Sequence, residues 1–167
     1  MTFDWDIKPL AGVGPLEFGM TPSQVAAVLG DVEFLDNPEL SAGGPYPKDE
    51  TVTEFRVFTT YSETHLPDAT YYSNELQTVD VGWHLESLHL GDVYLFKNTP
   101  IVTADLLTKM SKHYAFDDTS YIFLDLGVSM SIEDWDEAPP VHLFGKGEFD
   151  EFVEEGVRLN RLKLVQS

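Results

Sequence analysis

The clearest pattern of hydrophobic and polar positions along the chain predicts a short helix near the N-terminus. Val25, Val28 and Leu29 are spaced so that their side chains share one helix face, with polar or small residues between them. Gly30 follows, and glycine readily adopts the left-handed backbone conformation that ends many helices. We therefore expect a helix of about eight residues that stops at Gly30.

The residues before this stripe predict where the helix begins. Thr21 suits the N-cap position, and Pro22 suits the first helical position because that residue has no helical partner for an N–H group. Gln24 stands three residues after Thr21 and completes a capping box. Met20 and Val25 are spaced for a hydrophobic staple across the helix start.

The pattern between the loop at 36–50 and residue 98 predicts strands. That loop is rich in glycine and proline and poor in large apolar side chains. In the segment 75–81, the inward-facing residues are Leu76 together with Val79 or Val81, and which of them faces inward depends on whether the strand contains a bulge. The predicted strands lie near 52–58, 69–72, 75–81 and 89–96, with turns at 73–74 and 91–92.

A second helix is predicted after Pro100 and is expected to reach about His113. Val102, Leu106 and Met110 recur at helical spacing, and Leu107 widens the stripe. The next segments predict strands at 121–124 and 128–132 around a turn near Leu126–Gly127, and a strand at 141–144 after a break at Pro139–Pro140.

The C-terminal part predicts a short helix and a last strand. Phe149, Phe152 and Val153 indicate the helix, which Gly156 closes, and Leu159, Leu162 and Leu164 indicate the strand.

Strands joined by short turns predict an α+β fold in which antiparallel sheets carry short helices on one face. Residues 1–167 are the size of one domain. Thr21-Pro22 and Thr99-Pro100 stand 78 residues apart, which suggests a degenerate tandem repeat with halves 13–97 and 98–167. A pair of unrelated helix starts explains the same dipeptides, so the pattern leaves both alternatives open.

Charge narrows the choice of partners. The chain has 10 basic and 29 acidic residues, a formal net charge of −19 spread over both halves. Such a chain repels phosphate, so we expect no nucleic-acid partner. The same negative charge accelerates the association with a basic protein. The alternative explanation is that the charge only keeps the protein soluble.

Other compositional features exclude several classes of site. There is no cysteine, which excludes disulfides, thiolate metal sites and a cysteine nucleophile. No apolar run approaches the ~18 residues of a membrane span, and no basic leader precedes Asp4. We expect a soluble cytoplasmic protein with no membrane partner. The oligomeric state is not predicted.

The sequence offers no convincing catalytic or metal site. His84, Glu86 and His89 resemble fragments of metal motifs, but the two histidines are five residues apart and share no face of a helix or strand. The segment Gly127-Val128-Ser129-Met130-Ser131 lacks the second glycine of a nucleophile elbow. We therefore predict no catalytic residue, no metal and no cofactor.

Acidic residues beside an aromatic side chain form the candidate binding site. Four acids flank one tryptophan in Glu133-Asp134-Trp135-Asp136-Glu137, and a second acidic pair is Asp117-Asp118. Aromatic side chains anchor protein interfaces, and surrounding carboxylates steer a basic partner. A solvated acidic loop is the alternative for the carboxylates, and core packing is the alternative for Trp135.

The segment 13–30, Val-Gly-Pro-Leu-Glu-Phe-Gly-Met-Thr-Pro-Ser-Gln-Val-Ala-Ala-Val-Leu-Gly, resembles the opening element of small α+β proteins related to bacterial toxin-immunity proteins. A similar order of helix and sheet occurs in β-lactamase-inhibitor-like domains, some of which are tandem repeats. The segment 123–130 is similar to a second element of such proteins. The resemblance implies a binding protein without catalytic residues.

Resemblance and charge together predict an immunity protein that binds and neutralises a cognate bacterial toxin, a basic protein. The partner-binding residues would be the two acidic segments and Trp135. The alternative is a housekeeping α+β domain with an enzymatic or small-ligand pocket, which a deep cavity around His84 and Glu86 would favour.

Overall fold

The computed structural model describes residues 3–30, 34–36, 56–58, 67–72, 74–135 and 141–167. Most of the predicted loop at 36–50, the first part of the strand near 52–58, Ser73 of the predicted turn and Pro139–Pro140 lie outside the described residues.

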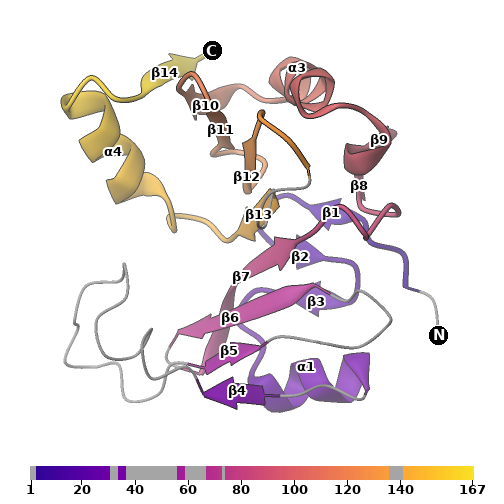
Figure 1. The fold of residues 1–167 in the computed structure, drawn as a ribbon. Coiled ribbons are helices and arrows are strands. Elements are labelled where there is room, and N and C mark those ends of the chain that lie inside the picture. Colours follow the sequence, from indigo (N-terminus) through magenta and orange to yellow (C-terminus); the bar gives the residue numbers. More distant parts are fainter. Residues whose placement is uncertain (1–2, 31–33, 37–55, 59–66, 73, 136–140) are drawn as a thin grey trace.

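One antiparallel sheet of nine described strands runs through both halves of the chain (Figure 1). Its order from edge to edge is β14 (Lys163–Gln166), β10 (His113–Phe116), β11 (Ser120–Phe123), β12 (Val128–Ser131), β13 (Val141–Phe144), β7 (Glu75–Val81), β6 (Asp68–Tyr72), β5 (Arg56–Phe58) and β4 (Phe34–Asp36). Two small antiparallel sheets join β1 (Ile7–Lys8), β2 (Gly12–Val13) and β3 (Leu16–Glu17), and β8 (His89–Leu90) with β9 (Val93–Tyr94).

Three helices and one 3₁₀ turn complete the described elements: α1 (Pro22–Leu29), η1 (Leu95–Lys97), α3 (Pro100–Met110) and α4 (Asp150–Arg158). The predicted α+β class with antiparallel sheets is confirmed. None of these helices is long and apolar enough to cross a membrane.

The order of elements repeats once along the chain. Helix α1 precedes the meander β4–β7, and α3 precedes the meander β10–β13. The two meanders meet where β13 pairs with β7, so each meander contributes four adjacent strands to the large sheet, and β14 adds a fifth strand from the second half beside β10. A duplication of the halves would produce this order, but the duplication itself stays a prediction.

Two hydrophobic clusters lie on opposite faces of the sheet. Paired residues on neighbouring strands share a face, and successive residues alternate between faces. Phe123 and Val128 therefore face the larger cluster, which includes Ala104 and Leu107 of α3 and Val25 of α1. Ala115 and Ile122 face the smaller cluster, which includes Val153 of α4. The helices thus cover both faces, whereas the sequence pattern predicted one.

The predicted start and end of the first helix are confirmed. The Thr21 hydroxyl accepts a hydrogen bond from the Gln24 amide at 3.3 Å, and the Gln24 side chain accepts one from the Thr21 amide at 2.9 Å. Pro22 is the first helical residue, and Gly30 caps the end with φ +85°.

Replacing Thr21 with alanine should lower the free energy of unfolding by about 1 kcal/mol, because the first turn of α1 then loses its side-chain acceptor. Thr99 is the matched control, since it holds the N-cap position of α3 without a side-chain cap. We expect a smaller loss from Thr99→Ala in urea unfolding. Equal losses would contradict a specific role for the Thr21 cap.

The second helix was predicted correctly, but its buried face and its end were not. Thr103, Ala104 and Leu107 face the core, whereas Val102 and Met110 are 44% and 42% exposed. The Thr103 hydroxyl is satisfied inside by donating to the Leu95 carbonyl at 2.7 Å, which favours this face.

The second helix stops at Met110 rather than at His113 because another segment supplies its end. The Asp125 carboxylate, from the turn after β11, accepts hydrogen bonds from the Lys112 amide at 2.7 Å and from the Ser111 hydroxyl. These contacts draw the chain out of the helix and into β10, which begins at His113.

Gly156 lies inside α4 rather than at its end, which corrects the prediction. A Cβ atom at this position would lie 2.5 Å from Leu162 Cδ1. Glycine is therefore needed here for the close approach of the chain after the helix. The helix continues to Arg158.

The bulge that the sequence left open at 75–81 is present. Ala69 pairs with Val79 but Tyr71 pairs with Leu76, so β7 carries one extra residue opposite β6. Leu76 and Val79 are consequently both buried, despite their odd spacing.

Candidate functional site

The Asp117 side chain closes the hairpin between β10 and β11. Its Oδ1 accepts hydrogen bonds from the amides of Thr119 and Ser120, each at 2.8 Å, and from their hydroxyls, each at 3.0 Å. Burial raises the pKa of Asp117, but these hydrogen bonds together outweigh it and leave the pKa below its ordinary value. The carboxylate is thus engaged in holding the turn, and the neighbouring Asp118 is exposed.

The Asp117–Thr119 turn lies beside the segment that follows β12. The Thr119 carbonyl accepts hydrogen bonds from the Ile132 amide at 2.9 Å and from the Ser131 hydroxyl at 3.4 Å. The Ser131 hydroxyl in turn accepts one from the Glu133 amide at 3.2 Å. The fold therefore brings the two acidic segments to the same end of the sheet.

Trp135 sits at the border of the larger core. Its indole N–H donates to the Asn98 carbonyl at 2.7 Å, and its ring meets Phe96 edge-on, with centroids 5.0 Å apart. The side chain is half-buried against the core cluster. Core packing and a role as an interface anchor are therefore both compatible with the position of Trp135, because part of its ring packs inward and part remains accessible.

We use the name acidic rim for three exposed carboxylates, Asp118, Glu133 and Asp134. Glu133 and Asp134 directly precede Trp135 in the sequence, and Asp118 belongs to the turn that the Thr119 carbonyl joins to this segment. Asp136 and Glu137, also predicted for this site, lie outside the described residues. The rim can attract cations over a distance, and the accessible part of Trp135 can contribute apolar contact area.

The residues considered for metal binding are placed apart from one another. His84 is exposed and its ring lies against Trp83, with centroids 3.7 Å apart, and Glu86 is exposed too. His89 instead lies in β8, with Nε2 at 2.8 Å from Asp4 Oδ1 and Nδ1 at 2.9 Å from the Gly91 carbonyl. In the described part of the chain, no group of three histidine or acidic side chains could hold a metal ion.

His89 has a structural task that the sequence did not indicate. The hydrogen bond that His89 donates to Asp4 raises the pKa of His89, and this effect exceeds the lowering by burial. With acceptors at both ring nitrogens, the imidazolium ion fits this site best, and it ties the N-terminal segment to β8.

A histidine and an aspartate that sequence reasoning missed meet on the sheet. His142 of β13 pairs in register with Asp80 of β7, and its Nδ1 is hydrogen-bonded to the Asp80 carboxylate. That bond raises the pKa of His142 above its usual value, against the lowering effect of burial. The residues are 62 positions apart, so only strand pairing could have revealed the contact.

Ser129 of β12 pairs in register with His142, so serine, histidine and aspartate form a row across three strands. A nucleophilic serine needs a hydrogen bond to the histidine that takes its proton. Among the described contacts there is none between Ser129 and His142. The row therefore gives no support to the alternative of an enzymatic site.

Comparisons of the chain with protein-family models, with curated proteins and with solved structures found no match.

Proposed function

We propose that this chain is an immunity protein, a cytoplasmic binding protein without enzymatic activity that neutralises a cognate basic toxin. The observation that carries the proposal is the meeting of the two acidic segments beside Trp135, through the Thr119 carbonyl. The net charge of −19 adds long-range attraction for a basic partner. The resemblance of residues 13–30 to immunity proteins supports the same class.

The proposed inhibition is steric and electrostatic. The acidic rim would lie over basic residues of the toxin that otherwise hold its substrate, and Trp135 would anchor the contact. A nucleic acid or an anionic membrane is not proposed as a partner, because both would be repelled by the same carboxylates.

The direct test is capture followed by rescue. The purified chain is used to capture proteins from an extract of its native organism, and each captured protein is then expressed in a test host with and without this chain. A captured protein that arrests growth alone and is harmless beside the chain supports the proposal. If every captured protein is harmless when expressed alone, the proposal is wrong.

Reversing charge on the rim should slow association with such a toxin. We expect Asp118→Lys/Asp134→Lys to reduce the association rate constant about tenfold at low salt and to flatten its salt dependence. Asp117 is left intact, because its loss would disturb the turn. Surface plasmon resonance at two salt concentrations measures both effects.

The matched control is Glu17→Lys/Glu75→Lys, which changes net charge equally at two exposed sites on β3 and β7, near α1. We expect a clearly smaller effect from it. If both variants slow association equally, only the net charge matters and the rim is not the interface.

A further inference from the structure

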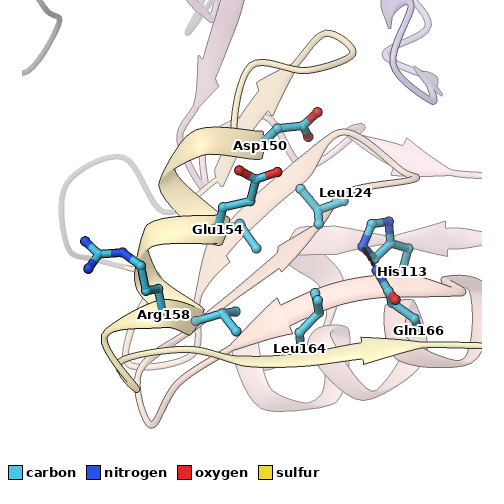
Figure 2. A pocket seen from close by; sticks show the side chains of 9 residues that line it. His113, Leu124, Asp150, Glu154, Arg158, Leu164 and Gln166 are labelled. Atoms are coloured by element: carbon cyan, nitrogen blue, oxygen red, sulfur yellow. Dashed lines mark hydrogen bonds between the residues drawn. The ribbon is translucent and has the colours of Figure 1, made fainter.

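Helix α4 and the sheet enclose a groove that is separate from the acidic rim (Figure 2). One flank of α4 forms its wall, with Val153, Glu154 and Val157, and the floor includes Leu124 and Leu164. The cavity volume is about 420 Å³. This volume lies within the range of sites that bind small molecules or single side chains.

The groove exists because α4 rests on the sheet along its other flank. There Gly156 allows Leu162 of the smaller core to lie directly against the helix, while Val153 is buried in the same core and also borders the groove. The flank that carries Glu154 and Val157 is left above Leu124, which directly follows β11, and Leu164 of β14. Leu164 is 39% exposed on this floor.

Two exposed carboxylates stand on the groove wall. Asp150 and Glu154 are four residues apart on α4 and therefore neighbours on one helix face, as Figure 2 shows. Like charges at this spacing repel each other. Arg158 also lines the groove, but its guanidinium points away from these two carboxylates (Figure 2), and its Nη2 lies 3.4 Å from Glu155 Oε1. Within the described residues, neither carboxylate has an ion pair or hydrogen bond.

The remaining polar groups of the groove are partnered. His113 Nε2 and Gln166 Nε2 lie 3.0 Å apart at the far side of the floor. The groove therefore combines an apolar floor with two unneutralised negative charges at one wall. A linear aliphatic chain ending in an ammonium group matches both features.

We infer that the α4 groove binds the side chain of a lysine presented by a partner protein. The four-carbon stem would lie on Leu124, Val157 and Leu164, and the ammonium group would lie between Asp150 and Glu154. A protein is favoured over a free amine because the floor, where Leu164 is 39% exposed, remains open to solvent, so that a partner surface can cover it.

This inference does not rest on the proposed function. The groove lies where β10 begins, at His113, whereas the Asp117 turn that adjoins the acidic rim follows the end of β10 at Phe116. The groove and the rim are thus separate surfaces, and each can be tested without the other.

The test is a titration of the full-length ¹⁵N-labelled protein with the peptide acetyl-Leu-Lys-Leu-amide, followed by NMR. We expect shifts of the amide signals of Leu124, Val153, Val157 and Leu164. The same peptide with norleucine in place of lysine keeps the stem and lacks the charge, and it should bind more weakly. Equal binding of the two peptides would overturn the inference, as would shifts confined to other parts of the chain.

Two double variants separate local from overall charge. Asp150→Asn/Glu154→Gln should lower the affinity for the lysine peptide about fivefold, which is the combined effect expected from the loss of two exposed ion pairs. Glu151→Gln/Glu75→Gln removes the same charge at exposed positions outside the groove, including one first-turn acid of α4, keeps the contact of Arg158 with Glu155, and should leave affinity close to that of the original protein. Equal weakening by both variants would show that the groove carboxylates have no specific role.

A free amine distinguishes the source of the ammonium group. If n-pentylammonium alone binds at least as tightly as the lysine peptide, the groove is a small-molecule site and the inferred protein partner is wrong. Weaker binding of the free amine supports the inference, because flanking peptide contacts then add affinity.

Discussion

Replacing Gly127 with alanine is expected to lower the free energy of unfolding by about 3 kcal/mol. Gly127 has φ +69°, in the left-handed region, where any other residue is strained. In addition, a Cβ atom would lie 2.5 Å from the Phe144 carbonyl oxygen and 3.1 Å from the Leu10 amide nitrogen. Both are backbone atoms, so the clash cannot be relieved by a side-chain rotation.

The position matters because three segments meet there. The Gly127 amide donates to the Phe123 carbonyl and the Gly127 carbonyl accepts from the Phe144 amide, each at 2.9 Å. These bonds join the turn between β11 and β12 to the end of β13. A displaced turn would therefore disturb both neighbouring strands.

Gly91 supplies the control for Gly127. It also has positive φ, +55°, but nothing lies within 4 Å of where its Cβ atom would be. Gly91→Ala should lower the free energy of unfolding by only about 1 kcal/mol, because the alanine is strained at positive φ but meets no steric clash. Urea unfolding of both variants measures the difference. If the two losses are equal, steric contact at Gly127 contributes nothing.

The features that the sequence predicted well are those decided by nearby residues. Thr21, Pro22, Gln24 and Gly30 specify the ends of α1 through contacts within ten positions, and all four have the predicted roles. The sequence left the bulge in β7 open, because Leu76 and Val79 face inward together only if it is present, and the pairing with β6 shows that it is. Local chemistry has few alternatives in such segments.

The features that were mispredicted depend on contacts between a helix and residues outside it, which the helical spacing of apolar residues does not reveal. The buried face of α3 is set by Leu95, which accepts from Thr103, and its end is set by Asp125. Gly156 follows the rule for helix ends in sequence, yet Leu162 requires its small size inside the helix. Spacing along the chain carries no information about such partners.

The candidate site divides in the same way. The acidic segments could be read from composition, but their meeting depends on the pairing of β11 with β12. The contact of His142 with Asp80 likewise depends on the pairing of β13 with β7. The α4 groove had no sequence signal beyond the helical spacing of Asp150 and Glu154.

Trp135→Ala is expected to destabilise the fold by about 2 kcal/mol, less than the loss for a fully buried aromatic side chain. The variant loses the packing on Phe96 and leaves the Asn98 carbonyl without the indole N–H. Trp135→Phe retains a ring against Phe96 and loses only the donor, so its expected loss is about 1 kcal/mol. Urea unfolding orders the two variants.

Binding to the cognate toxin gives Trp135 a second, independent readout. If its accessible part anchors the interface, Trp135→Ala should accelerate dissociation about 30-fold, which corresponds to about 2 kcal/mol. Trp135→Phe should have a much smaller effect, and Trp83→Ala, which removes a 42% exposed tryptophan elsewhere, should have none. Each variant is first confirmed to be folded at the temperature of measurement. If a folded Trp135→Ala protein dissociates at the original rate, the indole has only a structural role, through Phe96 and Asn98. In that case another residue anchors the interface.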